Sequence, residues 1–242
     1  MDMEPTDRFV LVPGFWLGAW AWDEVAAHLS VAGARPRPLT LPGLEAPDAA
    51  RAGLHLEDHV DAVIAALREP AGRPAVLVAH SGACAPVTMA VDRAPELVRR
   101  VVYVESGPLP DGAAVEPGLD PAATVLPLPT WEEFAAKGTS LDGLDEERLA
   151  VFRRRAVPHP AGPAREPVRL RDERRRDVPV TLVASSFTLE QVHGLVAAGH
   201  PWFAELARLH VDEVALPTGH WPMWSRPREL ADVLLAALVP AR

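Results

Sequence analysis

The 242 residues of this chain suffice for one large α/β domain or two small ones, and a hydrophobic content of 48% supports a substantial core. The formal net charge of -9 argues against a nucleic-acid-binding surface, which needs clustered cations. The single cysteine, Cys84, excludes an internal disulfide, and no long apolar run or N-terminal apolar leader is found, so we expect a soluble cytoplasmic protein that does not bind membranes.

Short apolar runs alternate with helical patterns along most of the chain. Strands are predicted at 8–13, 37–43, 75–79, 101–105, 178–184 and 211–216, and helices at 22–29, 56–67, 82–94 and 230–238. Strands that are continuous apolar runs are typical of a parallel sheet covered on both faces. The predicted fold class is therefore α/β, with a mostly parallel sheet of about six strands flanked by helices.

The alternation is interrupted once, between about residues 108 and 177, where the chain is rich in Pro, Ala and Arg. Helical patterns occur there at 130–137 and 144–155, but no strand signal. An insertion after the C-terminal end of a strand lies over the sheet edge where open α/β folds bind ligands. We therefore expect a single domain over residues 1–242 with a helical lid at about 108–177. The basic run 171–176 contains interleaved acids and is expected to be a solvated loop or helix face.

Residues 79–83, Ala-His-Ser-Gly-Ala, directly follow a predicted strand. A nucleophile elbow holds its serine at a strained strand-to-helix turn, and only small residues fit two positions before and after it. Ala79 and Ala83 meet this requirement, although glycine is usual there, so Ser81 is the candidate nucleophile. Cys84 is expected to pack behind the turn, because no basic residue near it in sequence would activate its thiol.

A serine hydroxyl needs a base to remove its proton. His220 follows the last predicted strand and precedes the last helix, which places it at the same sheet edge as Ser81. His80 is expected to pack, because successive side chains point apart. Two histidines are expected on a helix surface and two in or near the lid, where they could touch substrate: His55 and His59, then His159 and His200.

Acyl transfer also needs hydrogen-bond donors for the oxyanion. We expect them to be the backbone amides of Gly82, directly after the nucleophile, and of Phe15, in the turn after the first strand. No cluster of His, Cys, Asp and Glu at zinc-ligand spacing occurs, and no glycine-rich phosphate loop follows a strand. Neither a metal nor a phosphate-bearing cofactor is therefore expected.

Residues 13–22, Pro-Gly-Phe-Trp-Leu-Gly-Ala-Trp-Ala-Trp, resemble the HGxWHGAWxW stretch of the small α/β-hydrolases that include plant methyl esterases and hydroxynitrile lyases. With the Ser81 elbow and Gly219-His220, the resemblance covers nearly the whole chain in the right order. It implies an α/β-hydrolase fold with a helical cap, and hydrolysis of an ester or related bond without a cofactor. Pro13 stands where the family usually has His. Trp221 stands where hydroxynitrile lyases have Lys, which speaks against cyanide elimination.

The triad acid is the main departure from this family. An Asp follows the equivalent of strand 178–184 in the family, whereas this chain has Ser-Ser-Phe-Thr at 185–188 and no carboxylate before Glu190. Glu105 ends the preceding strand, a position that supplies the acid in some haloalkane dehalogenases of the wider superfamily. Those enzymes use an Asp nucleophile, so Ser81 argues against their chemistry. Glu105 is the favoured acid, Glu190 is the alternative, and a site without an acid stays open.

These residues predict a serine hydrolase that cleaves a carboxylic ester, thioester or lactone of a small apolar or aromatic substrate through an acyl-enzyme. The candidate pocket residues are Trp16, Trp131, His159 and Trp224, and core packing is the alternative for each tryptophan. Two other functions stay open. One is C–C bond hydrolysis or a cyclisation in secondary metabolism on the same scaffold, and the other is non-catalytic binding of a small molecule, as in some plant hormone receptors of this fold.

Overall fold

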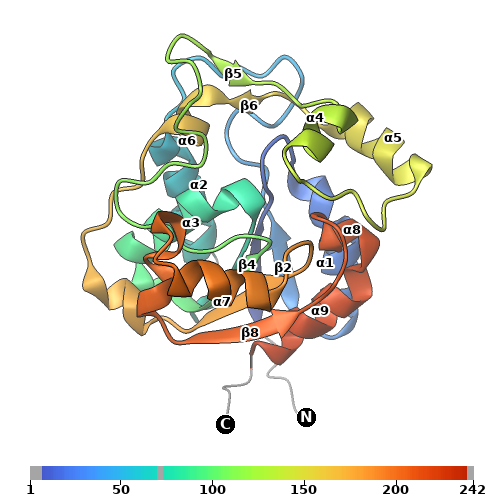
Figure 1. The fold of residues 1–242 in the computed structure, drawn as a ribbon. Coiled ribbons are helices and arrows are strands. Elements are labelled where there is room, and N and C mark those ends of the chain that lie inside the picture. Colours follow the sequence, from blue (N-terminus) through green and yellow to red (C-terminus); the bar gives the residue numbers. More distant parts are fainter. Residues whose placement is uncertain (1–6, 70–72, 239–242) are drawn as a thin grey trace.

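The computed structural model describes residues 7–69 and 73–238, which are built around a six-stranded parallel sheet (Figure 1). The strands are β1 (Arg8–Val12), β2 (Arg35–Pro38), β3 (Ala75–His80), β4 (Val98–Val104), β7 (Val180–Ala184) and β8 (Val211–Ala215). Their order across the sheet is β2-β1-β3-β4-β7-β8, and every neighbouring pair is parallel. The predicted α/β class and strand number are confirmed. Within the described ranges, no helix has both the length and the apolar character needed to cross a bilayer.

The second strand lies earlier in the chain than predicted. It pairs with β1 through Arg35–Pro38 and ends there, whereas the sequence pattern favoured 37–43. β2 is an edge strand, and Pro36 and Pro38 are tolerated because alternate N–H groups of an edge strand have no neighbour to bond. Prolines and arginines in alternation carry no apolar signal, so pattern reading missed this strand's start.

Each face of the sheet is covered by its own set of helices. Val10 and Val12 of β1 pack into one core cluster, and Phe9 and Leu11 into the other, as expected for alternating side chains. Helices α2 (Leu56–Arg68) and α3 (Cys84–Arg93) cover the first face, together with Val192 of α7 (Leu189–Ala197). The second face is covered by α1 (Asp23–Val31), α8 (Pro222–Ser225) and α9 (Pro227–Ala236) (Figure 1).

The helices and short strands of the long connection between β4 and β7 lie at one end of the molecule, and its last part returns along one side to β7 (Figure 1). It contains α4 (Trp131–Ala136), α5 (Glu146–Arg155) and α6 (Ala161–Arg165), with side-chain N-caps at Thr130 and Asp145 opening the first two. The expectation of no strand in this segment is wrong. Two short strands, β5 (Val125–Leu126) and β6 (His159–Pro160), pair antiparallel. Strands of two residues are too short to produce an alternating pattern, so the sequence gives no sign of them.

The basic run 171–176 is only partly solvated, contrary to expectation. Arg175 in the short 3-10 helix η4 (Glu173–Asp177) is buried, and its Nε lies 3.0 Å from Glu205 Oε1. Arg176 Nε contacts the same carboxylate oxygen at 3.0 Å. Glu205 is 29 and 30 residues away in sequence, so local charge patterning could not predict that these cations are paired inside the fold.

Candidate active site

Three residues with unusual backbone conformation meet at one end of the sheet. Trp16, Ser81 and Glu105 have φ angles of 67°, 51° and 52°, and they are the non-glycine residues with positive φ among those described. Such conformations cost about 1–3 kcal/mol each and persist where surrounding structure enforces them, commonly at functional sites. Ser81 follows β3 and opens the short helix η2 (Ser81–Ala83), which is the strand-to-helix turn that the sequence predicts.

Close packing explains the small residues around this turn. A Cβ on Gly14 would lie 2.9 Å from His80 Nδ1 and 3.1 Å from Ser81 Cβ. On Gly82 it would lie 2.5 Å from the ring of Phe15. A side chain at either position would therefore force neighbouring atoms to shift, and the loop after β1 lies directly against the serine turn.

The structure brings the predicted serine, histidine and glutamate into one hydrogen-bonded chain. His220 Nε2 lies 2.8 Å from Ser81 Oγ, and His220 Nδ1 lies 3.1 Å from Glu105 Oε2. With the proton on Nδ1, the imidazole donates to the carboxylate and accepts from the hydroxyl. This is the arrangement in which a histidine can take the serine proton as a general base.

Glu105 is held on all sides. Its side chain is fully buried, and Oε1 accepts hydrogen bonds from the amides of Ser185 and Ser186 at 2.7 and 2.8 Å. Ser186 also donates its hydroxyl to Oε2, the oxygen that faces His220. A buried carboxylate needs such partners. The alternative acid, Glu190, is exposed in the first turn of α7 and has no contact with His220.

The loop that carries His220 is fixed from two directions. His80 Nε2–H donates to the His220 carbonyl oxygen at 2.7 Å. Burial lowers the pKa of His80 to about 3, so its ring is neutral and keeps this donor. On the other side, the amides of Gly219 and His220 donate to the carbonyl oxygens of Asp142 and Ser140 at 3.0 and 2.9 Å. The β4–β7 connection thus contacts the histidine loop directly.

The two expected oxyanion donors are the amides of Gly82 and Phe15, and neither has a partner within the described residues. Gly82 is the second residue of η2, and amides in the first turn of a helix have no intrahelical acceptor. Phe15 follows Gly14 in the loop pressed against Ser81, and among the described residues its amide has no backbone or side-chain acceptor. Both amides are therefore available to a ligand oxygen.

A cavity of about 140 Å³ opens beside Ser81 and His220. Half of the lining residues come from the ends of the sheet strands and the loops that follow them, and half come from the β4–β7 connection. The lining residues are Phe15, Trp16, His80, Ser81, Val115, Glu116, Pro129, Phe134, Lys137, Thr139, His220 and Trp221. A small organic group with an apolar part fits such a wall, which combines four aromatic rings with few charges.

Three of the four candidate pocket residues lie outside this cavity, and only Trp16 lines it. Trp131 stacks on Phe134 and carries the Arg153 guanidinium 3.7 Å above its ring. Trp224 is buried and donates Nε1–H to the Ala21 carbonyl at 3.0 Å. Trp131 packs against Phe134 and Phe152 of the same connection. Trp224 packs against Phe152 and Trp221, so both tryptophans have the core-packing role that was the alternative to pocket lining.

The expectation that His159 lines the pocket is also wrong, because its ring packs against Phe15 and does not line the cavity beside Ser81. Its ring centroid lies 4.3 Å from that of Phe15, and burial lowers its pKa well below the usual value. His59 is buried as well, 2.9 Å from the Pro42 carbonyl, although the helix pattern placed it at the surface. The β4–β7 connection packs on that face of α2 through His159. A contact with a segment so distant in sequence leaves no pattern in the helix itself. His55 is exposed as expected, and His200 lies in an exposed loop without a contact to the cavity.

Several cavity residues were not identified from the sequence. Lys137, Glu116 and Thr139 come from the connection, where spacing carries no information about which side chains face the serine. One compositional signal existed: Lys137 is the single lysine of a chain whose other basic residues are arginines. Within the described residues, no group of three or more His, Cys, Asp or Glu side chains is placed to hold a metal ion. Burial raises the pKa of the Cys84 thiol to about 12, as expected for a packing residue.

Known proteins share this fold and part of this sequence. A protein of Arabidopsis thaliana named "Putative methylesterase 12, chloroplastic" is 32% identical over 108 residues, which is 43% of this chain and 31% of that protein. The match therefore spans about a third of that relative's length.

Solved structures match over almost the full chain. An extracellular alpha/beta-hydrolase from a Paenibacillus species, described as homologous to tobacco salicylic acid binding protein 2, has a TM-score of 0.77 at 18% identity, covering 96% of this chain and 98% of that one. The Arabidopsis methylesterase MES16 has a TM-score of 0.72 at 19% identity, with 96% and 98% covered. Tomato methylketone synthase I has the same TM-score and identity, with 96% and 97% covered. At these identities the likeness shows a shared fold.

The family assignment comes from the sequence itself. The model of the alpha/beta hydrolase family matches residues 9–233, from β1 into α9. This range contains the serine turn, the glutamate after β4 and the histidine after β8. The chain belongs to the alpha/beta hydrolase family.

Proposed function

We propose that this chain is a serine hydrolase that cleaves carboxylic esters of small apolar or aromatic acids or alcohols. The observation that carries the proposal is the hydrogen-bonded chain from Ser81 through His220 to Glu105, with distances of 2.8 and 3.1 Å. The methylesterase names of the Arabidopsis relatives support an ester substrate. The aromatic wall and the small volume of the cavity support a compact substrate group.

In the proposed reaction, Ser81 Oγ attacks the ester carbonyl carbon while His220 Nε2 takes its proton. The amides of Phe15 and Gly82 stabilise the oxyanion, and Glu105 stabilises the protonated imidazole. His220 then gives the proton to the leaving alcohol, which leaves an acyl group on Ser81. In the second half His220 deprotonates a water molecule, which releases the acid and restores the serine.

The β4–β7 connection is proposed to act as a lid over this site. It supplies half of the cavity wall, including Phe134 and Lys137. Substrate selection would therefore depend on this segment, while the chemistry depends on loops that follow the strands.

The test compares wild type with Ser81→Ala on short p-nitrophenyl esters and on methyl esters of small aromatic acids. We expect turnover by the wild type, labelling of Ser81 by a fluorophosphonate, and loss of both in the variant with an unchanged melting temperature. Turnover that persists in the variant would refute the serine mechanism. Labelling of Ser81 without turnover of any ester would favour C–C bond cleavage or cyclisation, and resistance to labelling would favour a binding protein.

A further inference from the structure

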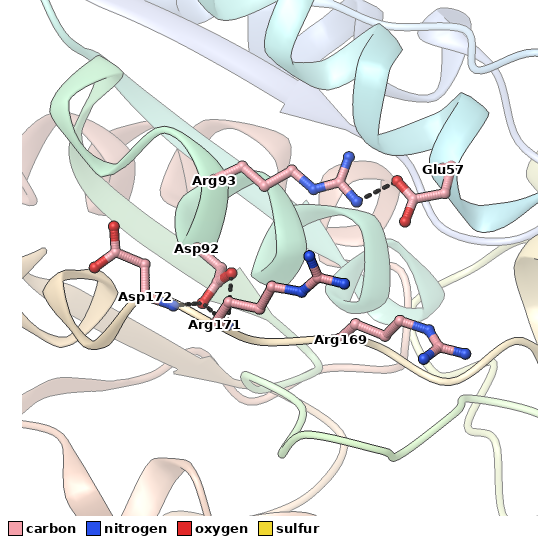
Figure 2. A pocket seen from close by; sticks show the side chains of 6 residues that line it. All are labelled: Glu57, Asp92, Arg93, Arg169, Arg171 and Asp172. Carbon is pink, nitrogen blue, oxygen red and sulfur yellow. Dashed lines mark hydrogen bonds and ion pairs between the residues drawn. The ribbon is translucent and has the colours of Figure 1, made fainter.

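A second hollow, with a volume of about 490 Å³, lies away from Ser81 and shares no lining residue with the first cavity. All of its lining residues are charged, and they come from α2, α3 and the extended segment before η4 (Figure 2). They are Glu57, Asp92, Arg93, Arg169, Arg171 and Asp172. A wall made only of charged side chains indicates a polar or ionic ligand.

The three carboxylates of this hollow already have partners. Glu57 forms an ion pair with Arg93. Asp92, with a side chain only 4% exposed, accepts hydrogen bonds at 2.9 Å from the amides of Arg171 and Asp172. Asp172 itself pairs with Arg174 at 2.6 Å. The negative charges are therefore largely neutralised within the fold.

Within the part of the chain that the structure describes, the guanidinium groups of Arg169 and Arg171 have no such partners. Neither forms an ion pair or a side-chain hydrogen bond within residues 7–69 and 73–238. The two residues are two positions apart, and Leu170 between them packs against the core, so both arginines lie on the same side of the segment. Figure 2 shows the two side chains extending in the same direction.

The backbone that carries these arginines is firmly held. Besides the two bonds to Asp92, the amide of Leu170 donates to Asp111 Oδ1 at 2.9 Å. The attachment points of the two unpaired cations are thus positioned before any ligand arrives, which reduces the entropy lost on binding.

We propose that this hollow binds a phosphate-type oxyanion through Arg169 and Arg171. Planar guanidinium groups offer paired N–H donors that match the oxygens of a phosphate. The hollow is larger than one phosphate, so a diphosphate or the phosphate group of a larger molecule fits best. The site would act separately from the ester chemistry, because none of its residues touches Ser81, His220 or Glu105.

The experiment measures the binding of inorganic phosphate, pyrophosphate and adenosine diphosphate by calorimetry at low ionic strength. The double variant Arg169→Gln/Arg171→Gln removes the two unpaired cations. Its matched control, Arg208→Gln/Arg228→Gln, removes two exposed arginines elsewhere and gives the same net charge. We expect wild type and control to bind pyrophosphate with similar affinity, and the double variant to bind at least tenfold more weakly.

Equal affinity in all three proteins, or no binding to the wild type, would overturn the proposal. Tighter binding of the nucleotide than of pyrophosphate would support an organic phosphate as the occupant, and the reverse order would support a free one. Ester hydrolysis by the double variant should equal that of the wild type, and a melting temperature within the range of the control shows that the fold is intact.

Discussion

Glu105→Gln tests the assignment of the carboxylate that contacts His220. Glutamine has the same shape, and its oxygen can still accept the amides of Ser185 and Ser186. Its NH2 group would then face His220 Nδ1 and the Ser186 hydroxyl. A donor opposite Nδ1–H favours the other imidazole tautomer, in which Nε2 is protonated and cannot accept the Ser81 proton.

The expected loss follows from that change of tautomer. An amide in place of the triad carboxylate lowers kcat by about 10⁴, or about 5 kcal/mol of transition-state stabilisation. The assay is kcat/KM on p-nitrophenyl acetate, with circular dichroism and thermal melting to confirm folding. Glu190→Gln is the matched control, because Glu190 is exposed and distant from His220, and it should keep full activity. A Glu105→Gln enzyme within tenfold of wild type, or a large loss in Glu190→Gln, would refute the assignment of the acid.

Three further predictions concern packing, pH and thiol reactivity. Gly82→Ala should lower the free energy of unfolding by roughly 1–3 kcal/mol, because the new Cβ would lie 2.5 Å from the Phe15 ring. Gly194→Ala in α7 should raise it by about 1 kcal/mol, because no atom lies within 4 Å of the new Cβ and alanine favours the helix. Chemical denaturation measures both changes. Burial lowers the pKa of His80 to about 3, that of His59 to about 4 and that of His159 well below its usual value, so the unfolded chain binds more protons than the folded one. The free energy of unfolding should therefore fall as pH drops from about 6.5 toward 4, by up to roughly 1.4 kcal/mol per pH unit for each ring. A free energy of unfolding that does not change with pH would contradict this. Cys84 should resist Ellman's reagent in the native protein and react on unfolding, and fast native reaction would show that the thiol is not buried.

The arrangement of Ser81, His220 and Glu105 could be predicted because parallel strands end at one edge of the sheet. Each residue directly follows an apolar run, or a short loop after one, and the topology then brings them together. The choice between two acids rested on strand position, and the structure places Glu105, not Glu190, beside the imidazole. The ends of the strands were therefore enough to predict which three side chains lie together.

The walls of the cavity could not be predicted in the same way. Trp131 and Trp224 looked like ligand-binding aromatics, yet each packs against other aromatic rings. Lys137 lines the cavity from the end of the predicted helix at 130–137, and the helical pattern does not indicate which of its side chains face Ser81. The side chains of a long connection face inward or outward according to their contacts with distant elements. These contacts cannot be deduced from one sequence. The burial of His59 escaped prediction for the same reason.

The hydrogen bonds between the His220 loop and the carbonyl oxygens of Ser140 and Asp142 have a consequence for the order of events in the proposed reaction. A Cβ on Gly219 would lie 2.5 Å from the Asp142 carbonyl oxygen, so the two loops touch without a spacer. Any outward swing of this part of the connection, to admit a reactant or release a product, would break both bonds and loosen the imidazole. Hydrolysis by the proposed mechanism would then stop while the connection is open, and it would resume only when the connection closes again.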